Sequence, residues 1–172
     1  MAATLLYLQI DFDGKAVSGE STAKDFTSQI EVESFDWGIA AKHTENARDR
    51  EVNTSITPET LTIEKFFDAS STRLALYMKD NKPFKTATLR FTDGTMVDGR
   101  DNSLKPVLTL TLTDGFVEDI KLSSTSAGKA MAVRETVALS FKKLRFEYRP
   151  PVTATDSRGA ACIFETNVAT AT

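Results

Sequence analysis

Cysteine and histidine are almost absent from this chain of 172 residues, which contains only Cys162 and His43. A single cysteine cannot form an internal disulfide, and a single histidine excludes a histidine-rich metal site. A Cys–His nucleophilic pair is conceivable, but His43 begins a charged segment and Cys162 lies in an apolar one. We therefore expect no redox chemistry, no zinc site and no catalysis by this pair.

A surplus of positive charge is also lacking. The chain has 21 lysines and arginines against 24 aspartates and glutamates, which gives a formal charge of −3. A general nucleic-acid binder needs a clustered basic surplus to neutralise phosphates. The charge balance therefore argues against nucleic acid as a partner.

Long hydrophobic runs are missing as well. The first apolar run covers only residues 5–8 and has no basic residue before it, unlike a secretory signal peptide. No stretch approaches the roughly 18 uninterrupted apolar residues that a membrane-spanning helix requires. We expect a soluble chain that is made in the cytoplasm, does not insert into membranes and, if it leaves the cell, is exported by a dedicated machine.

Motifs of enzymes and cofactor sites are absent too. The sequence has no GxSxG nucleophile elbow, and a serine triad would have to recruit the sole histidine. The segment DFDG at 11–14 lacks most of the oxygen donors of a calcium loop, and GESTAKD at 19–25 lacks the pattern of a phosphate-binding loop. The sequence therefore predicts a non-enzymatic protein without cofactor or metal, whose role is structural or binding.

Alternation of apolar and polar residues is the strongest positive signal. In LTLTLT, residues 108–113, the leucines share one face of a strand and the threonines share the other. Because the alternation continues after the turn signal Asp114-Gly115, residues 107–123 are predicted to form a β-hairpin. Further strands are predicted at residues 4–12, 28–40, 52–57, 84–92 and 160–168.

Two predicted strands contain a change of phase. In residues 135–148 the apolar positions switch from odd numbers to even numbers at Lys142-Lys143, and in residues 30–38 they switch from even to odd near Ser34. A slip of one residue would expose half of each apolar set to solvent. The sequence therefore predicts a β-bulge at each of these two places.

One segment has the periodicity of a helix. It begins after a candidate N-cap, Asp68, and places Leu74, Tyr77 and Met78 on one side before Pro83 ends it. Many strands and one helix predict a mainly β fold, a β-barrel of two packed sheets with one short α-helix. The aromatic residues that fall on apolar faces are expected in its core: Trp37, Phe66, Phe67, Phe141 and Phe146.

Three segments are predicted to be irregular. Residues 42–53 have almost no apolar content, residues 92–102 are rich in Gly and Asp, and residues 150–159 form a linker before the last strand. The first segment is open to two interpretations, a mobile surface loop or a contact with a neighbouring subunit, in which mixed charges would set register. Its candidate contact residues are Lys42, Arg48, Asp49, Arg50 and Glu51.

Five segments of the chain form a specific set when they are taken in order. They are DGKAVSGES at 13–21, IEVESFDWG at 30–38, TIEKFFDASSTRL at 62–74, LTDGFVEDIKLSSTSAG at 112–128 and ETVALSFKKLRFEY at 135–148. Together they closely resemble the haemolysin-coregulated protein (Hcp) family, the tube proteins of type VI secretion. Two features depart from the family: Arg73 stands where proline is frequent, and residues 42–53 replace a stretch that is often rich in glycine. The resemblance implies that residues 1–172 form a single tube domain.

The resemblance also implies how the protein works. Six copies would form a ring, and rings would stack into a hollow tube that a contractile sheath propels, tipped by a trimeric spike. The tube would carry small secreted effectors in its lumen, so the protein would lie in the bacterial cytoplasm before firing and outside the cell afterwards. Phage tail tubes have a similar fold, so a tail-tube subunit of a phage or phage-like particle is the alternative.

Cargo contact is implied for one position. In the family, the residue between the two aromatics of the aromatic-x-Trp-Gly stretch faces the lumen, and here it is Asp36. Alternation places Glu31 and Glu33 on the same side as Asp36. We hypothesise that these three residues form an acidic lumen patch that favours basic cargo; the alternative is a solvated outer face.

Overall fold

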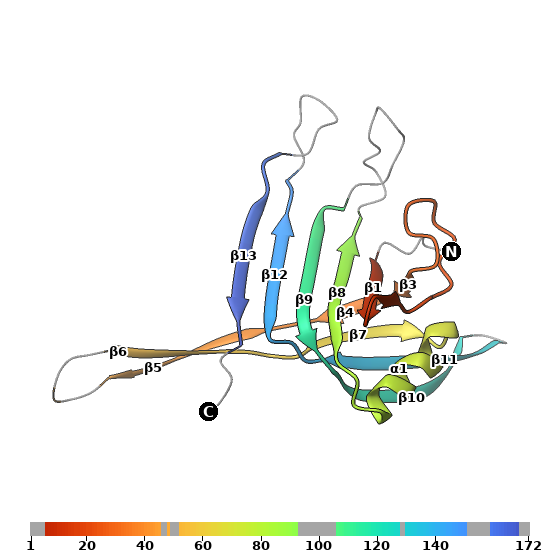
Figure 1. The fold of residues 1–172 in the computed structure, drawn as a ribbon, viewed down its shortest axis with the longest axis horizontal. Helices are drawn as coiled ribbons and strands as arrows, with labels where there is room; N and C mark the ends of the chain where they lie inside the picture. Colours follow the sequence, from red (N-terminus) through yellow and green to blue (C-terminus); the bar gives the residue numbers. More distant parts are fainter. Residues whose placement is uncertain are drawn as a thin grey trace.

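The computed structural model describes residues 6–45, 48, 52–92, 106–127, 130–150 and 159–168, and within these ranges the protein consists of two β-sheets, a two-stranded ribbon and one helix (Figure 1). The seven-stranded sheet contains β1 (Leu6–Phe12), β2 (Lys15–Ala16), β3 (Ile30–Val32), β8 (Phe84–Phe91), β9 (Leu108–Gly115), β12 (Lys143–Tyr148) and β13 (Cys162–Asn167). The four-stranded sheet contains β4 (Ser34–Asp36), β7 (Leu61–Phe66), β10 (Val117–Ala127) and β11 (Ala130–Leu139). The ribbon consists of β5 (Ile39–Glu45) and β6 (Val52–Pro58).

All pairs of strands are antiparallel. The seven-stranded sheet has the order β13-β12-β9-β8-β1, with both β2 and β3 paired to β1, and the four-stranded sheet has the order β10-β11-β7-β4. The two sheets cross each other at a steep angle (Figure 1). The predicted mainly β fold of packed sheets with one helix is confirmed, although the sheets share no paired strand in the described residues, so the barrel is not closed.

The core lies between the two sheets and follows the alternation seen in the sequence. Leu8 and Ile10 of β1, Leu112 of β9 and Val137 of β11 are almost completely buried, and they belong to one continuous apolar cluster. The threonines of β9 face the other way, as the alternation predicts. Side chains that alternate on a strand in this way fix which face of each sheet meets the core.

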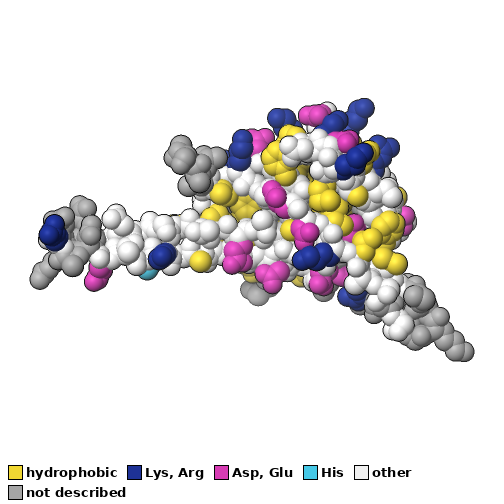
Figure 2. Space-filling view, turned by 90° about the horizontal axis from the view of Figure 1, so that it is seen from below, with side chains coloured by type: hydrophobic (Ala, Val, Ile, Leu, Met, Phe, Trp, Pro, Cys, Tyr) yellow, Lys and Arg dark blue, Asp and Glu magenta, His cyan; other side chains and the backbone are white. Residues whose placement is uncertain are grey.

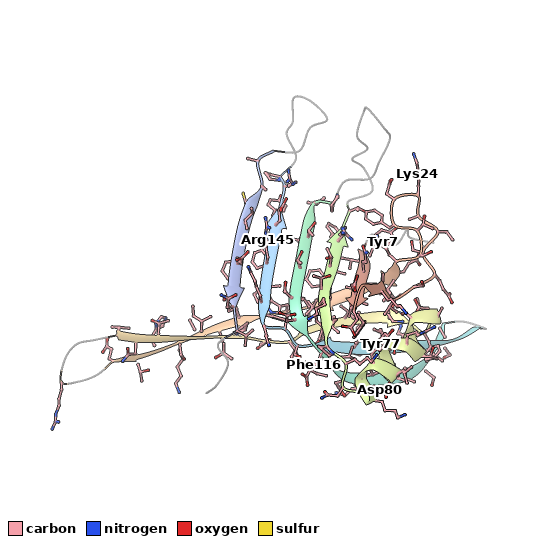
Figure 3. All side chains as sticks on the ribbon, in the orientation of Figure 1. Tyr7, Lys24, Tyr77, Asp80, Phe116 and Arg145 are labelled. Atoms are coloured by element: carbon pink, nitrogen blue, oxygen red, sulfur yellow. The ribbon has the colours of Figure 1, made fainter. Side chains whose placement is uncertain are left out.

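The predicted hairpin over residues 107–123 is wrong. Strand β9 pairs with β8 and β12 in the seven-stranded sheet, whereas β10 pairs with β11 in the four-stranded sheet. The chain turns a corner at Phe116 and passes from one sheet to the other (Figure 3). Asp114, which has a positive φ of 51°, therefore belongs to a corner and not to a hairpin turn.

The two predicted bulges are corners of the same kind. The chain leaves β3 for β4 at Glu33, whose N–H already donates to Glu64 O of the other sheet at 2.8 Å. It leaves β11 for β12 between Ser140 and Lys142. The phase changes were located correctly, but their cause is a crossing between sheets. When the chain passes from one sheet to the other, the opposite side of the strand comes to face the core, so the apolar positions shift by one residue.

The helix matches its prediction. Helix α1 (Ala69–Lys79) begins at the N-cap Asp68, whose carboxylate accepts a hydrogen bond from Ser70 N at 2.9 Å. Leu74 is buried, whereas Met78 is 37% exposed at the edge of the buried side.

The prediction of an irregular segment at residues 42–53 is wrong at both ends of the segment. Residues 42–45 lie in β5 and residues 52–53 lie in β6, and the two strands pair over their full length. The ribbon extends far beyond the body of the molecule (Figure 2), so its side chains stay exposed. Because neither face of the ribbon is buried in the core, residues 42–53 lack the alternation of apolar and polar residues that indicates a strand. The predictions for residues 93–102 and for most of the linker at 150–159 lie outside the described residues.

Candidate assembly and binding surfaces

The four-stranded sheet presents a polar outer face on the side away from the core. Alternate residues of β7 and β11, such as Ile63 and Val137, are buried in the core, so the residues between them point outward. The strand registers then place these residues on the outer face: Ser34, Asp36, Thr62, Glu64, Phe66, Asp119, Lys121, Ser123, Arg134, Thr136 and Ala138.

Acidic groups on this face outnumber the basic groups that could balance them. Lys121 lies 3.2 Å from Asp119, and Arg134 lies 3.1 Å from Glu33 at the adjacent corner. Each cation is thereby paired with one carboxylate. The outer face keeps a negative excess from its two remaining acids, Asp36 and Glu64.

A shallow hollow holds two acids, Asp36 and Glu64, that have no cationic partner among the described residues. It has a volume of about 360 Å³ and is lined by Ser34, Phe35, Asp36, Thr62 and Glu64. Glu64 accepts a hydrogen bond from the Ser34 hydroxyl at 3.0 Å, and Asp36 has no ion pair or hydrogen bond within the part of the chain that the structure describes. A cationic side chain is the group that these carboxylates would bind best.

The structure divides the three acids of the hypothesised patch. Glu31, Glu33 and Asp36 are all exposed, but Glu31 lies on β3 in the seven-stranded sheet, directly across from Tyr7. Burial, with a smaller contribution from the Glu31 carboxylate, raises the pKa of Tyr7 above the ordinary value of a phenol. The structure groups Asp36 with Glu64 instead, which the alternation of TIEKF at 62–66 could have revealed had that segment been identified as a strand.

Two of the aromatic residues expected in the core are on the surface. Phe66 is 45% exposed and Phe67 is 46% exposed, whereas Phe141 is buried. Trp37 and Phe146 are partly buried and pack against the core, with their rings 5.8 Å apart. Phe66 is exposed because the outward positions of β7 alternate with the buried Ile63 and Lys65. This strand was not predicted from the sequence, so the outward position of Phe66 was not expected.

The ribbon has one face that is mainly apolar. Ile39 and Ala41 of β5 lie opposite Pro58 and Ile56 of β6, and directly opposed residues share a face. The pair Glu45–Val52 belongs to this face, and so does the pair His43–Thr54, whose side chains are 2.9 Å apart. Exposed apolar surface of this kind marks an interaction site in soluble proteins.

The contact residues predicted in the segment 42–53 fall in three places. Lys42 lies on the opposite face of the ribbon, paired with Ser55, and Arg48 is exposed near the tip. Asp49, Arg50 and Glu51 lie outside the described residues.

A buried ionic cluster lies where the helix meets the four-stranded sheet. Lys65 is fully buried, and its Nζ lies 2.7 Å from Asp68 and 2.8 Å from Glu135. The same Nζ donates to Ser71 Oγ at 2.9 Å. The cluster joins β7, β11 and α1, and its enclosure suits a structural role.

Among the described residues, no group of three or more His, Cys, Asp or Glu side chains could hold a metal ion. No helix in those residues is long and apolar enough to cross a membrane.

Comparisons with known proteins agree with the arrangement of the sheets. A structure described as a type six secretion system protein aligns with a TM-score of 0.74 and 24% identity, covering 93% of this chain and 92% of that one. Hcp1 from Salmonella typhimurium aligns with a TM-score of 0.69 and 24% identity, covering 95% of each chain. Hcp3 from Pseudomonas aeruginosa, at 13% identity, aligns with a TM-score of 0.64 and covers 98% of this chain and 100% of that one.

No curated protein matches the sequence. The model of one family does match, over residues 7–148, and its description is "Type VI secretion system effector, Hcp". This match covers most of the chain, and the solved structures share its fold. The chain therefore belongs to the Hcp family, the secreted, ring-forming tube proteins and effector carriers of type VI secretion.

Proposed function

We propose that this chain, as a single domain over residues 1–172, is the repeating subunit of a type VI secretion inner tube, with six copies in each ring. The observation that carries the proposal is the four-stranded sheet, which combines a polar outer face with edges at β10 and β4 that no other described strand pairs with. Free edges seek hydrogen-bonding partners, and a ring of copies can supply them by continuing the sheet. Six copies of this sheet would enclose the lumen with about 24 strands, a size at which a barrel leaves an open channel.

The seven-stranded sheet would then form the exterior of the tube. Its outward positions include threonines that lie in register on β8 and β9, with Thr86 opposite Thr113 and Thr88 opposite Thr111. This polar surface would face the contractile sheath, and a trimeric spike would cap the end of the tube. The protein would wait in the bacterial cytoplasm and leave the cell when the sheath contracts. This role requires no catalysis.

The ribbon would hold neighbouring subunits together. Its apolar face needs a partner, and the proposed partner is the next copy of this chain, within the ring or across the stack. Deleting residues 44–50 should weaken ring stacking or tube assembly, as should Ile56→Asp on the apolar face. Thr57→Asp is the matched control, since Thr57 lies on the other face opposite Ala40. Normal tubes from both the deletion and Ile56→Asp would leave the ribbon without an assembly role.

The acidic residues of the outer face would select cargo with basic surfaces. Asp36→Lys should change which effector is protected or co-purified, while rings still form. Glu31→Lys makes the same change of charge on the other sheet and should leave cargo unchanged. If Asp36→Lys binds the same cargo to the same extent as the wild type, Asp36 does not contact cargo.

Electron microscopy of the purified protein tests the proposed assembly directly, because it should show rings of six. Secretion into the medium that depends on the ATPase serving the sheath would then distinguish a type VI tube from a phage-like tail tube. A stable monomer without annular particles at any concentration would overturn the proposed function.

A further inference from the structure

Phe66 is an unusual residue for the outer face of the four-stranded sheet. Its side chain is 45% exposed and points outward from β7 in a surface whose other outward residues, apart from Ala138, are polar. An exposed phenylalanine on such a strand leaves apolar area in water, and aromatic side chains contribute a large share of the energy of interfaces where they become buried.

The ring of Phe66 is held on one side by a cation. The guanidinium of Arg134, directly across the strand pair, lies 5.3 Å from the centroid of the ring. Arg134 is itself held by Glu33 at 3.1 Å. This support fixes the aromatic side chain against the sheet, and close to half of its surface remains open to a partner.

The neighbouring charges indicate the chemistry of that partner. Glu64 precedes Phe66 by two residues on the same face, at a spacing of about 7 Å for a β-strand. Beyond Glu64, the hollow adds the carboxylate of Asp36. An acidic group and an open aromatic ring in a row are complementary to a segment in which basic and apolar side chains are neighbours.

We propose that Phe66, together with Glu64, forms a cargo-binding strip that recognises basic segments carrying exposed apolar side chains. The inference rests on the proposed function, because it places this face in the lumen. Lysine or arginine of the cargo would pair with Glu64, and an apolar side chain beside it would pack on Phe66. Six copies around a ring would multiply a weak single contact.

The experiment uses rings of the full chain and three dye-labelled peptides of equal length. One alternates Arg and Leu, one alternates Arg and Ser, and one alternates Glu and Leu. Fluorescence anisotropy should show the Arg/Leu peptide binding most tightly to wild-type rings. Phe66→Thr should weaken that peptide by roughly tenfold and leave the Arg/Ser peptide nearly unchanged.

Two further variants sharpen the test. Phe67→Thr removes an aromatic of equal exposure just beyond the end of β7 and should bind all peptides as the wild type does. Phe66→Leu keeps an apolar side chain without the aromatic ring, so it provides the measurement if Phe66→Thr does not fold. It should bind the Arg/Leu peptide with an affinity between those of wild type and Phe66→Thr.

Each outcome has a distinct meaning. Intact rings with undiminished Arg/Leu binding in both Phe66 variants would overturn the inference and leave the proposed function standing. Loss of rings in a folded Phe66 variant would make the side chain a subunit contact and would also overturn it. Failure of the wild type to form rings would be a failure of the proposed function itself.

Discussion

Lys65 shows how a charged residue can be a core residue. Its ammonium group is fully buried, and it is held by Asp68, Glu135 and the hydroxyl of Ser71. Burying a charge is costly unless it is paired and hydrogen-bonded, and here both conditions are met. The sequence alone gave no sign of this, because Glu135 is far from the other members along the chain.

Removing the buried cation should destabilise the fold strongly. In Lys65→Met, the carboxylates of Asp68 and Glu135 would lose their common partner, and we expect a loss of about 3–5 kcal/mol in the free energy of unfolding. Urea denaturation measures the change. Lys121→Met removes an exposed cation paired with Asp119 and should cost less than about 1 kcal/mol. Equal losses in the two variants would contradict a structural role for the cluster.

Tyr7 should make the stability of the protein sensitive to alkaline pH. Its ring stacks on Phe26 at 4.4 Å between centroids, and burial with the nearby Glu31 raises its pKa. In the unfolded chain the phenol loses its proton near pH 10, whereas in the folded chain it keeps the proton to higher pH, so stability falls as the pH rises above about 10.

Tyr7→Phe tests this dependence. The free energy of unfolding of the variant, measured with urea from pH 9 to pH 11, should fall less steeply than that of the wild type. Tyr148→Phe, at an exposed position, is the control and should follow the wild-type curve. Parallel curves for Tyr7→Phe and wild type would exclude the Tyr7 phenol as the cause.

At the scale of elements, the corners at residues 114–117 and 140–142 support each other. Ser140 N donates to Phe116 O at 3.0 Å, and Lys142 N donates to Thr113 O at 3.1 Å. Gly115 sits where they meet, because an added Cβ would collide with the carbonyl oxygen of Ser140 and the ring of Phe84. The two places where the chain changes sheet are therefore packed as one unit.

Gly115→Ala should disrupt this unit. The methyl group has no free space, so we expect a loss of several kcal/mol or failure to fold, as overpacking of a core costs about 1–3 kcal/mol and backbone contact adds to it. Gly14→Asn is the control, because Gly14 has a positive φ of 79° with no atom within 4 Å of an added Cβ. Thermal unfolding followed by circular dichroism compares the two; an unaltered midpoint in Gly115→Ala would show that the corners can separate.

The predictability of the elements followed their burial. The strand at 84–91 and helix α1 each bury one side and were found from periodicity, with Asp68 marking the start of the helix. The ribbon buries almost nothing, so its strands at 42–45 and 52–53 looked like a charged loop. Corners and bulges give the same one-residue slip in sequence, and only the pairing of strands distinguishes them.

The candidate site was predictable only in part for a related reason. Asp36 was found through the family resemblance, and its exposure could be inferred from alternation. Its grouping with Glu64 and Phe66 depends on β4 pairing with β7, a contact between distant parts of the chain. Periodicity identifies the faces of a strand, but it does not say which strands are neighbours.

At the scale of the whole molecule, the subunit has sheet edges and exposed apolar residues that favour assembly with other copies. Among the described strands, β13 ends the seven-stranded sheet on one side and β2 and β3 end it on the other, β10 and β4 end the four-stranded sheet, and the ribbon exposes Ile39 and Ile56. Such edges invite pairing between chains. Assembly into rings would cover them.

Assembly should make thermal stability depend on protein concentration. Partners that bind only the native subunit stabilise it by mass action, so the midpoint of unfolding should rise between about 1 µM and about 100 µM protein. Differential scanning calorimetry measures the shift. Ile56→Asp, which places a charge on the apolar face of the ribbon, should reduce it. A constant midpoint for the wild type would show that the subunit folds without help from its neighbours.

The corner at Glu33 also constrains how a chain with this fold can change in length. Glu33 interrupts the alternation of Ile30 and Val32 with Phe35, and it does so at the point where the backbone moves between layers. Without Glu33 the apolar residues would alternate without a change of phase, and the pattern would predict one straight strand in a single sheet. The number of residues at a corner therefore fixes which side chains face the core in both layers. Tolerated insertions and deletions should occur elsewhere, at the tips of hairpins, where a change in length does not alter which side chains face the core.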